Sequence, residues 1–227
     1  PGISNNRVAL ENALDIRKEK RENLHKELGI ADDQKIFLAI GSGYRTKGLE
    51  RSIRLMADLK QDLNNNVKSY VLLVAGQDKA DKFIQLAKKL NVDGCVKFLG
   101  GRDDIPELLQ AADVVLHPAH KENTGNVLLE AMVAGRPVIA TDVCGYAHYI
   151  DEARMGAVIS SPFLQETYLE IVEKVLAVDD RTWRERGKIF SQREEIYSRP
   201  EFVVNALEKI IGRSLQARTQ TNAQGAT

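Results

Sequence analysis

Two glutamates, Glu122 and Glu130, are the residues of this 227-residue sequence whose types and spacing point most directly to chemistry. Between them, Gly125 opens an apolar segment with the character of a helix. The backbone N–H groups of Gly125, Asn126 and Val127 at such a helix start have no partner within the helix, and they can bind a phosphate oxygen. The segment therefore predicts an anion site with a carboxylate on either side.

Glu130 is the more informative of the two carboxylates because its sequence neighbours, 127–129 and 131–134, are all apolar. A carboxylate in such surroundings is costly unless donors satisfy it. A ribose diol is a suitable partner, since two adjacent hydroxyls can share the two oxygens of one carboxylate. Glu122, nearer the loop, is placed to meet the hydroxyls of a sugar. The alternative is that Glu130 pairs internally with a cation such as Arg136.

A second candidate anion site is the segment 41–48, Gly-Ser-Gly-Tyr-Arg-Thr-Lys-Gly, between a predicted strand and a predicted helix. Glycines such as Gly43 let the backbone approach a phosphate, and Arg45 and Lys47 supply positive charge. The segment is not a Walker A loop, because no Gly-Lys-Ser/Thr closes it, and Thr46 occupies the third glycine position of the dinucleotide fingerprint. The alternative is a simple turn with solvated cations.

The carboxylate pair also permits a glycosidase, whose acid and nucleophile flank the scissile bond. Here the two glutamates flank a phosphate-binding helix start, which disfavours hydrolysis. The sequence contains no Asp-x-Asp and no His/Asp/Glu cluster at metal-ligand spacing. We therefore expect no metal and no cofactor, with the charge of a leaving diphosphate met by Arg45, Lys47 and backbone amides.

Two further segments end predicted strands and leave alternatives open. The segment 100–104, with Arg102 and Asp103, either holds a nucleotide base through backbone groups or is only a turn and helix cap. His117 is either a hydrogen-bonded structural residue or a sugar contact. Cys95 and Cys144 lack any ligand spacing and are expected to be small buried hydrophobes in a reducing cytoplasm.

Short apolar segments alternate with longer amphipathic ones, which is typical of βαβ units. The pattern predicts an α/β fold with a Rossmann-like, doubly wound parallel sheet of about six strands, and ligands beyond the carboxyl ends of the strands. Strands are expected at 35–40, 70–75, 95–99, 114–117, 138–141 and 157–160, and helices at 17–26, 49–63, 79–90, 104–111 and 125–134. Extra C-terminal helices at 165–178, 181–197 and 200–211 must pack outside the sheet or reach another lobe. Residues 212–227 are polar and are expected to form a disordered tail.

Composition narrows the functional class. Acidic and basic side chains balance at 32 each, so no net charge favours nucleic acid, and 43% hydrophobic residues suffice for a full core. The sequence has no apolar run long enough to span a bilayer and no signal-peptide pattern. We expect a soluble protein, at most peripheral to a membrane.

With these residues placed, the chain resembles the C-terminal, donor-binding domain of retaining GT-B glycosyltransferases, a family marked by Glu, seven residues, Glu, here Glu122 and Glu130. Segments 76–79, 116–119 and 143–150 are similar to those of lipopolysaccharide core glucosyltransferases. The resemblance covers residues 1–211 and implies a UDP-sugar-binding domain, with the lipopolysaccharide core acceptor reached through an N-terminal lobe that this chain lacks.

The resemblance implies metal-independent transfer of a hexose from a UDP-sugar to the inner-core heptose of lipopolysaccharide, with retention of configuration. The enzyme would be cytoplasmic and peripheral on the inner membrane. This domain alone would bind UDP or a UDP-sugar without completing the transfer. The alternatives are a non-catalytic nucleotide-binding module and a UDP-sugar epimerase of related fold, because one fold hosts many activities.

Carried over by position, the resemblance implies catalytic roles for Lys47 and Arg45 at the diphosphate and for Glu122 at the donor sugar. Two departures stand out. Thr46 occupies the place of the family's usual cation, one residue after Arg45, and Asn126 replaces an apolar residue. The resemblance further implies donor binding by Gly43, Arg102 and Asp103 (the uracil loop), Gly125, Asn126, Val127 and Glu130 (the ribose).

Overall fold

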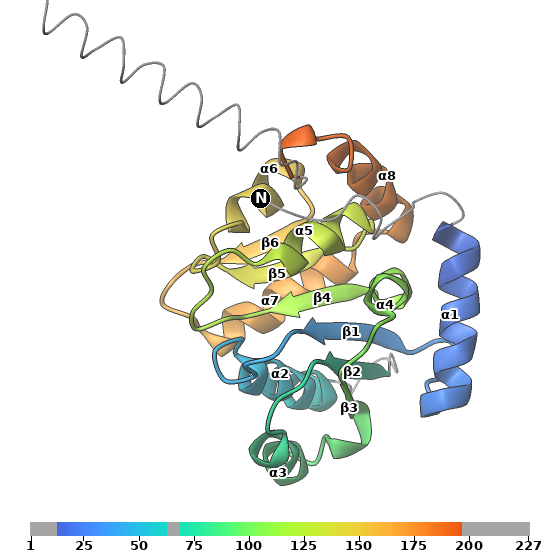
Figure 1. The fold of residues 1–227 in the computed structure, drawn as a ribbon. Helices are drawn as coiled ribbons and strands as arrows, with labels where there is room; N and C mark the ends of the chain where they lie inside the picture. The colour runs from blue at the N-terminus through green and yellow to red at the C-terminus, as the bar shows by residue number, and fades with distance from the viewer. Residues whose placement is uncertain (1–12, 63–68, 197–227) are drawn as a thin grey trace, which may run out of the picture.

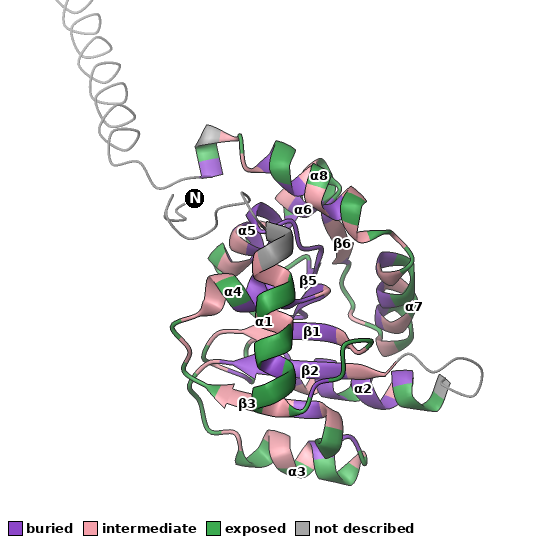
Figure 2. Ribbon diagram, turned by 90° about the vertical axis from the view of Figure 1, so that its right-hand side faces the viewer, coloured by how far each residue is buried: buried purple, intermediate pink, exposed green. Residues whose placement is uncertain are grey.

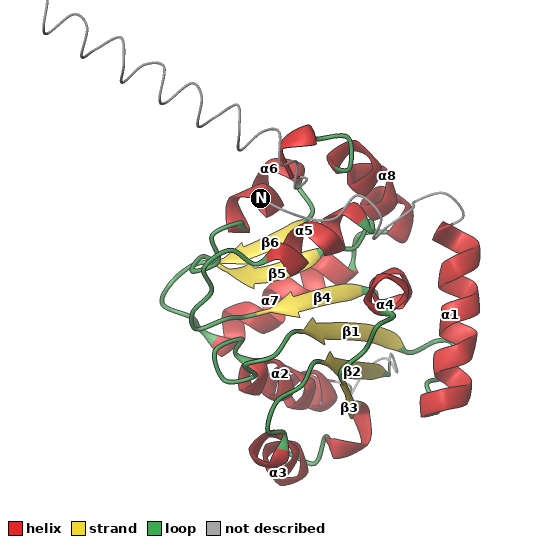
Figure 3. Ribbon diagram, in the orientation of Figure 1, coloured by secondary structure: helices red, strands yellow, loops and turns green. Residues whose placement is uncertain are grey.

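The computed structural model describes residues 13–62 and 69–196, and in them it confirms the doubly wound α/β fold (Figure 3). All neighbouring strands pair in parallel, in the order β3-β2-β1-β4-β5-β6. This is the order of dinucleotide-binding Rossmann sheets. The strands are β1 (Lys35–Ile40), β2 (Tyr70–Ala75), β3 (Val96–Gly100), β4 (Val114–His117), β5 (Val138–Thr141) and β6 (Gly156–Ile159).

Helices cover both faces of the sheet, which is why the central strands are continuously apolar. In Figure 2, α2 and α7 lie on one face and α4 and α5 on the other. Every residue of β4 and β5 is buried, as are the last five of β2. The helices are α1 (Ala13–Leu28), α2 (Leu49–Asp62), α3 (Asp81–Lys89), α4 (Ile105–Ala111), α5 (Asn126–Val133), α6 (Ala147–Ala153), α7 (Gln165–Leu176) and α8 (Asp180–Phe190), with 3-10 turns η1 (Asp93–Cys95) and η2 (Glu194–Ile196).

The structure differs from the sequence prediction at several places. Helix α6, of seven residues, was not predicted. The helix expected at 181–197 ends at Phe190 and is followed by the turn η2. Cys144 is buried as expected, whereas Cys95 is only partly buried. The predicted helix at 200–211 and the tail at 212–227 lie outside the described residues, and the domain boundary at 211 stays a prediction.

Within residues 13–62 and 69–196, none of the helices has the length and apolar character needed to cross a bilayer.

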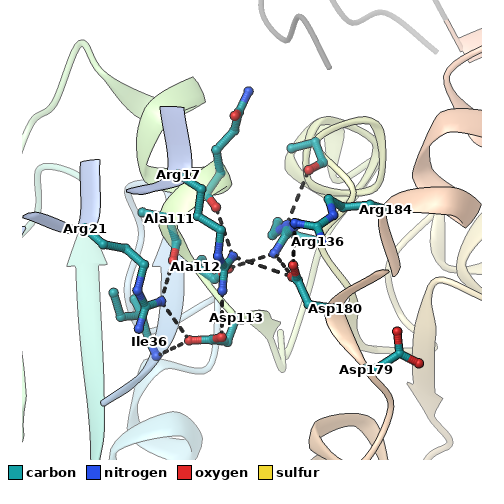
Figure 4. A network of polar contacts seen from close by, with 12 residues as sticks. Arg17, Arg21, Ile36, Ala111, Ala112, Asp113, Arg136, Asp179, Asp180 and Arg184 are labelled. Atoms are coloured by element: carbon teal, nitrogen blue, oxygen red, sulfur yellow. Dashed lines mark hydrogen bonds and ion pairs between the residues drawn. The ribbon is translucent and has the colours of Figure 1, made fainter. Parts of the chain in front are cut away.

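Helix α1 lies at the amino-terminal edge of the sheet, opposite the edge where the strands end (Figure 1). Asp113, just before β4, contacts α1 at this edge, and its side chain is 9% exposed (Figure 4). Its carboxylate accepts from Arg17 Nη2 at 2.8 Å and Arg21 Nη1 at 3.1 Å, both on α1, and from the Ile36 N–H at 2.7 Å. Burial alone would raise the pKa of Asp113, but these partners outweigh it and hold the pKa below its usual value.

The same network extends to α8. Arg136 is 2% exposed and its Nη1 donates to Asp180 Oδ1 at 2.5 Å, while Arg184 Nη1 lies 2.7 Å from Asp180 Oδ2. Arg17 Nη1 lies 3.7 Å from the same carboxylate of Asp180. Ionic contacts therefore connect α1 and α8 through Asp180, as Figure 4 shows.

Replacing Asp113 should destabilise the fold. Asp113→Asn leaves Arg17 and Arg21 without their shared counter-charge, and we expect a loss of about 2–4 kcal/mol in the free energy of unfolding, measured by urea denaturation at pH 7. Because the folded pKa is depressed, the contribution is present above the unfolded pKa of about 3.9 and is lost as pH falls through the folded value. The variant should therefore lose less stability on acidification.

The matched control is Glu185→Gln on α8. It removes the ion pair between Glu185 and Arg181, whose side chains are 63% and 83% exposed, respectively. This change should cost less than about 0.5 kcal/mol. Equal effects of the two substitutions would contradict a structural role for the Asp113 network.

Candidate functional site

The predicted site residues gather at the carboxyl edge of the sheet, where β1 and β4 lie side by side. The chain leaves β1 toward β2 and leaves β4 toward β5, in opposite directions along the sheet. The loops after the two strands, 41–48 and 118–125, therefore lie at the point of the sheet edge where this fold usually binds its ligands.

The two loops are held in contact through their backbones. Gly48 has φ 69°, and a Cβ at this position would lie 1.9 Å from the Pro118 carbonyl oxygen. The His120 N–H donates to the Thr46 carbonyl at 2.8 Å. Arg51 Nη1, on α2, donates to the carbonyls of Pro118 and Ala119 at 3.0 and 3.1 Å. Only glycine fits at position 48, and the spacing of the two loops is fixed.

Asp78, a residue that sequence reasoning did not assign to the site, orders the glycine loop. Its carboxylate accepts from the Tyr44 N–H at 2.7 Å and from the Lys79 N–H at 2.7 Å. The bonds from Lys79 and Tyr44, in that order, lower the pKa of Asp78. The Tyr44 hydroxyl donates to the Gly76 carbonyl at 2.6 Å. The loop after β2 therefore determines the shape of the loop after β1.

Lys47 and Glu122, which the sequence predicted to act at one site, form an ion pair across the two loops. Glu122 Oε2 also accepts from His117 Nε2 at 3.2 Å. The His117 bond, followed by the contact with Lys47, outweighs burial and lowers the pKa of Glu122 to about 2. The carboxylate is therefore ionised at neutral pH, and His117 has the structural hydrogen bond that was one of its two alternatives.

Gly125 and the residues after it form the helix start that the sequence predicted. Gly125 is the N-cap of α5 and has φ 86°, which favours glycine. Asn126 is exposed and Val127 is half-buried at the first turn. Arg45 is exposed on the facing glycine loop, and Gly43 has φ 77°. The start of α5 thus follows the loop whose Glu122 pairs with Lys47, so its first-turn amides lie on the same side of the sheet as the glycine loop.

A third loop supports the segment before α5. A Cβ at Gly145 would lie 2.2 Å from the Asn123 carbonyl oxygen, and the Tyr146 N–H donates to the Thr124 carbonyl at 3.0 Å. Glu122 and Cys144 form an isolated parallel β-bridge. These contacts fix the backbone of Glu122 relative to the loop between β5 and α6. Segment 143–150 stood out in the sequence for its resemblance, but the sequence did not predict that this segment supports the backbone before α5.

Glu130 lies half-buried on α5, between buried Leu129 and Ala131. Arg136, its suggested internal partner, pairs with Asp180 and donates to the Ala112 carbonyl at 3.3 Å. Contact between Glu130 and a ribose stays a prediction.

A depression with a cavity volume of about 460 Å³ lies at the carboxyl ends of β1, β2 and β3. Arg102 contributes to it, but its guanidinium is bound to neighbouring carboxylates: Nε and Nη2 each lie 2.8 Å from Asp104, and Nη1 lies 2.8 Å from Glu27 on α1. The bonds to Asp104 and then Glu27 raise the pKa of Arg102. Asp103 is exposed. The lining residues are Ile40, Gly41, Ser42, Ala75, Gly76, Gln77, Gly101, Arg102, Asp103 and Ile105.

The part of the chain that the structure describes contains no group of three or more His, Cys, Asp or Glu side chains arranged to hold a metal ion.

Comparisons with known proteins show the family of this chain. The family model described as "Glycosyl transferases group 1" matches residues 20–190. The chain is 44% identical over 183 residues to the lipopolysaccharide glucosyltransferase WaaG of Escherichia coli (strain K12). The aligned region covers 80% of this chain and 48% of that protein.

Two solved structures show the same fold. A crystal structure of WaaG, described as a glycosyltransferase involved in lipopolysaccharide biosynthesis, matches 91% of this chain and 54% of its own, with 41% identity and a TM-score of 0.80. Anabaena Alr3699/HepE in complex with UDP-glucose matches 88% of this chain and 53% of its own, with 23% identity and a TM-score of 0.65.

The chain thus spans about half the length of the relatives it matches. On the match of the family model and the likeness to WaaG, the chain belongs to the glycosyl transferases group 1 family, and its sheet is a Rossmann-like lobe of the GT-B fold.

Proposed function

We propose that this chain is the donor-binding lobe of a retaining glycosyltransferase that moves a hexose from a UDP-sugar to the lipopolysaccharide core. The observation that supports this most is the cluster of Lys47, Glu122 and His117 between the glycine loop and the start of α5. An ammonium and free helix amides suit a diphosphate, and an ionised carboxylate beside them suits sugar hydroxyls.

In this proposal the diphosphate lies between loops 41–48 and 118–125. Lys47, Arg45 and the amides of Gly125, Asn126 and Val127 offset the negative charge that grows on the leaving diphosphate, so that no metal is required. Gly43 allows close approach of the backbone. The positive charge of Lys47, Arg45 and the amides stabilises the leaving diphosphate more than the bound donor, and this difference accelerates the transfer.

The other contacts follow from the same placement. Glu122 binds hydroxyls of the donor hexose and Glu130 binds the ribose. The loop with Arg102 and Asp103 borders the depression at the ends of β1 to β3, where the uracil would lie. HepE has been solved with UDP-glucose in the same fold, which supports a uridine nucleotide.

The acceptor is proposed from WaaG, whose name describes a lipopolysaccharide glucosyltransferase. The relatives are about twice as long as the matched region, so we infer that the inner-core heptose binds residues outside it, in an N-terminal lobe. The full-length enzyme would work on the cytoplasmic face of the inner membrane, as a peripheral protein.

Donor binding is tested by titrating the chain with UDP and a panel of UDP-hexoses in a calorimeter, with circular dichroism to confirm folding. We expect binding of UDP and of at least one UDP-hexose. A folded chain that binds none of them at millimolar concentration would show the proposal to be wrong. For full-length protein with a core acceptor, UDP release supports transfer. Binding without release would indicate a non-catalytic module, and an altered sugar formed without acceptor would indicate an epimerase.

Glu130→Ala should weaken UDP binding by about 1 to 3 kcal/mol, because it removes a charged acceptor of two ribose hydroxyls. Calorimetry measures the change, and Glu152→Ala, at an exposed position of α6, is the control, expected to leave UDP binding unchanged. A UDP affinity that survives Glu130→Ala would instead assign this carboxylate a structural role.

Lys47→Ala should weaken UDP binding by about 1.5 to 3 kcal/mol, the loss expected for a charged hydrogen bond, while uridine binding changes little. Arg45→Ala reports whether the exposed guanidinium also reaches the diphosphate. Adding EDTA should leave the UDP affinity of the unaltered chain unchanged. A strong dependence on Mg²⁺ or Mn²⁺ would contradict charge compensation by side chains and amides.

A further inference from the structure

His117 is a buried side chain of the donor site to which the proposed function assigns no task. Its side chain is 1% exposed at the last residue of β4, so the strand fixes its position. Its Nε2 lies 3.2 Å from Glu122 Oε2. Among the described residues, this carboxylate also pairs with Lys47, whose side chain is 28% exposed and belongs to a loop. Glu122 therefore has one buried partner on a strand and one partly exposed partner whose long side chain can turn to a ligand.

A donor diphosphate competes with Glu122 for Lys47. The diphosphate carries more charge than one carboxylate, so it attracts the Lys47 ammonium away from Glu122. The Glu122 side chain is only 12% exposed, and water cannot fully replace a lost donor there. Without a second donor, Glu122 would lose its orientation at the moment when the sugar must bind.

The two described donors both contact the same oxygen. Lys47 Nζ and His117 Nε2 both approach Oε2, and within residues 13–62 and 69–196 no hydrogen bond is made to Oε1. A carboxylate held by one oxygen presents the other to a ligand hydroxyl. The backbone of Glu122 is fixed separately by its bridge to Cys144, so the bond from His117 sets the side-chain orientation.

We propose that His117 is a positioning residue: its Nε2–H holds the Glu122 carboxylate in place when Lys47 turns to the diphosphate, so that Oε1 meets a hydroxyl of the donor hexose. This inference rests on the proposed function, because it assigns a task within the same donor site. It differs from a purely structural role for His117 in one respect: it requires a donor at the position of Nε2 and not merely a side chain that fills the space.

Two substitutions separate these roles. The amide nitrogen of Gln reaches the position of imidazole Nε2, whereas that of Asn reaches only the position of Nδ1. His117→Asn should lower the affinity for UDP-glucose relative to that for UDP by about tenfold, the loss expected for a hydrogen bond to a charged group. His117→Gln should keep this ratio within about twofold of the unaltered chain. Calorimetry on the folded chain, with UDP-glucose and UDP as probes, gives both affinities.

A double-mutant cycle gives the second readout. In a Glu122→Gln background, His117→Asn should no longer change the affinity ratio, because the partner charge is already absent. The inference is overturned if His117→Asn leaves the ratio unchanged, if Gln and Asn act alike, or if the effect persists without the Glu122 charge. Failure of the unaltered chain to bind either nucleotide would overturn the proposed function instead, so the two failures are distinguishable.

Discussion

The close backbone approach of the loops after β1 and β4 is the constraint on which the site depends. Gly48 lies against the Pro118 carbonyl with no room for a side chain, and His120 donates to the same loop. This contact sets the distance at which Lys47 and Glu122 face each other. The sheet order places the two strands side by side, and the chain leaves them in opposite directions, so the position of the site follows from topology and the approach of its two loops follows from Gly48.

Charged groups occupy both edges of the sheet, with different tasks. At the amino edge, Asp113 and Asp180 are bonded to arginines of α1, α5–β5 and α8, and the ions there compensate one another within the protein. At the carboxyl edge, Arg45 is exposed, and Lys47 pairs with one carboxylate, that of Glu122, which also accepts from His117. The first arrangement stabilises the fold, whereas the second leaves positive charge for an anionic ligand.

The fold could be predicted from the sequence, and so could the placement of Lys47 and Glu122 at one edge of the sheet, because apolar periodicity sets the strands and parallel strands bring their ends to one edge. Their ion pair was not predicted. The roles of Asp78 and Gly145 could not be predicted. Each depends on a contact between loops far apart in the chain, such as Asp78 with the Tyr44 N–H and Gly145 with the Asn123 carbonyl, and no local pattern encodes such a distance. Arg102 shows the same limit, because its bond to Glu27 spans 75 residues.

The fixed guanidinium of Arg102 has a thermodynamic consequence for any ligand in the adjoining depression. Two carboxylates, one from α1 and one preceding α4, already restrict its rotamers. The entropy lost in ordering this long side chain, of order 2 kcal/mol for a free arginine, is incurred when the protein folds and not when a ligand binds. Association of any ligand with this depression therefore begins from a wall that is already rigid.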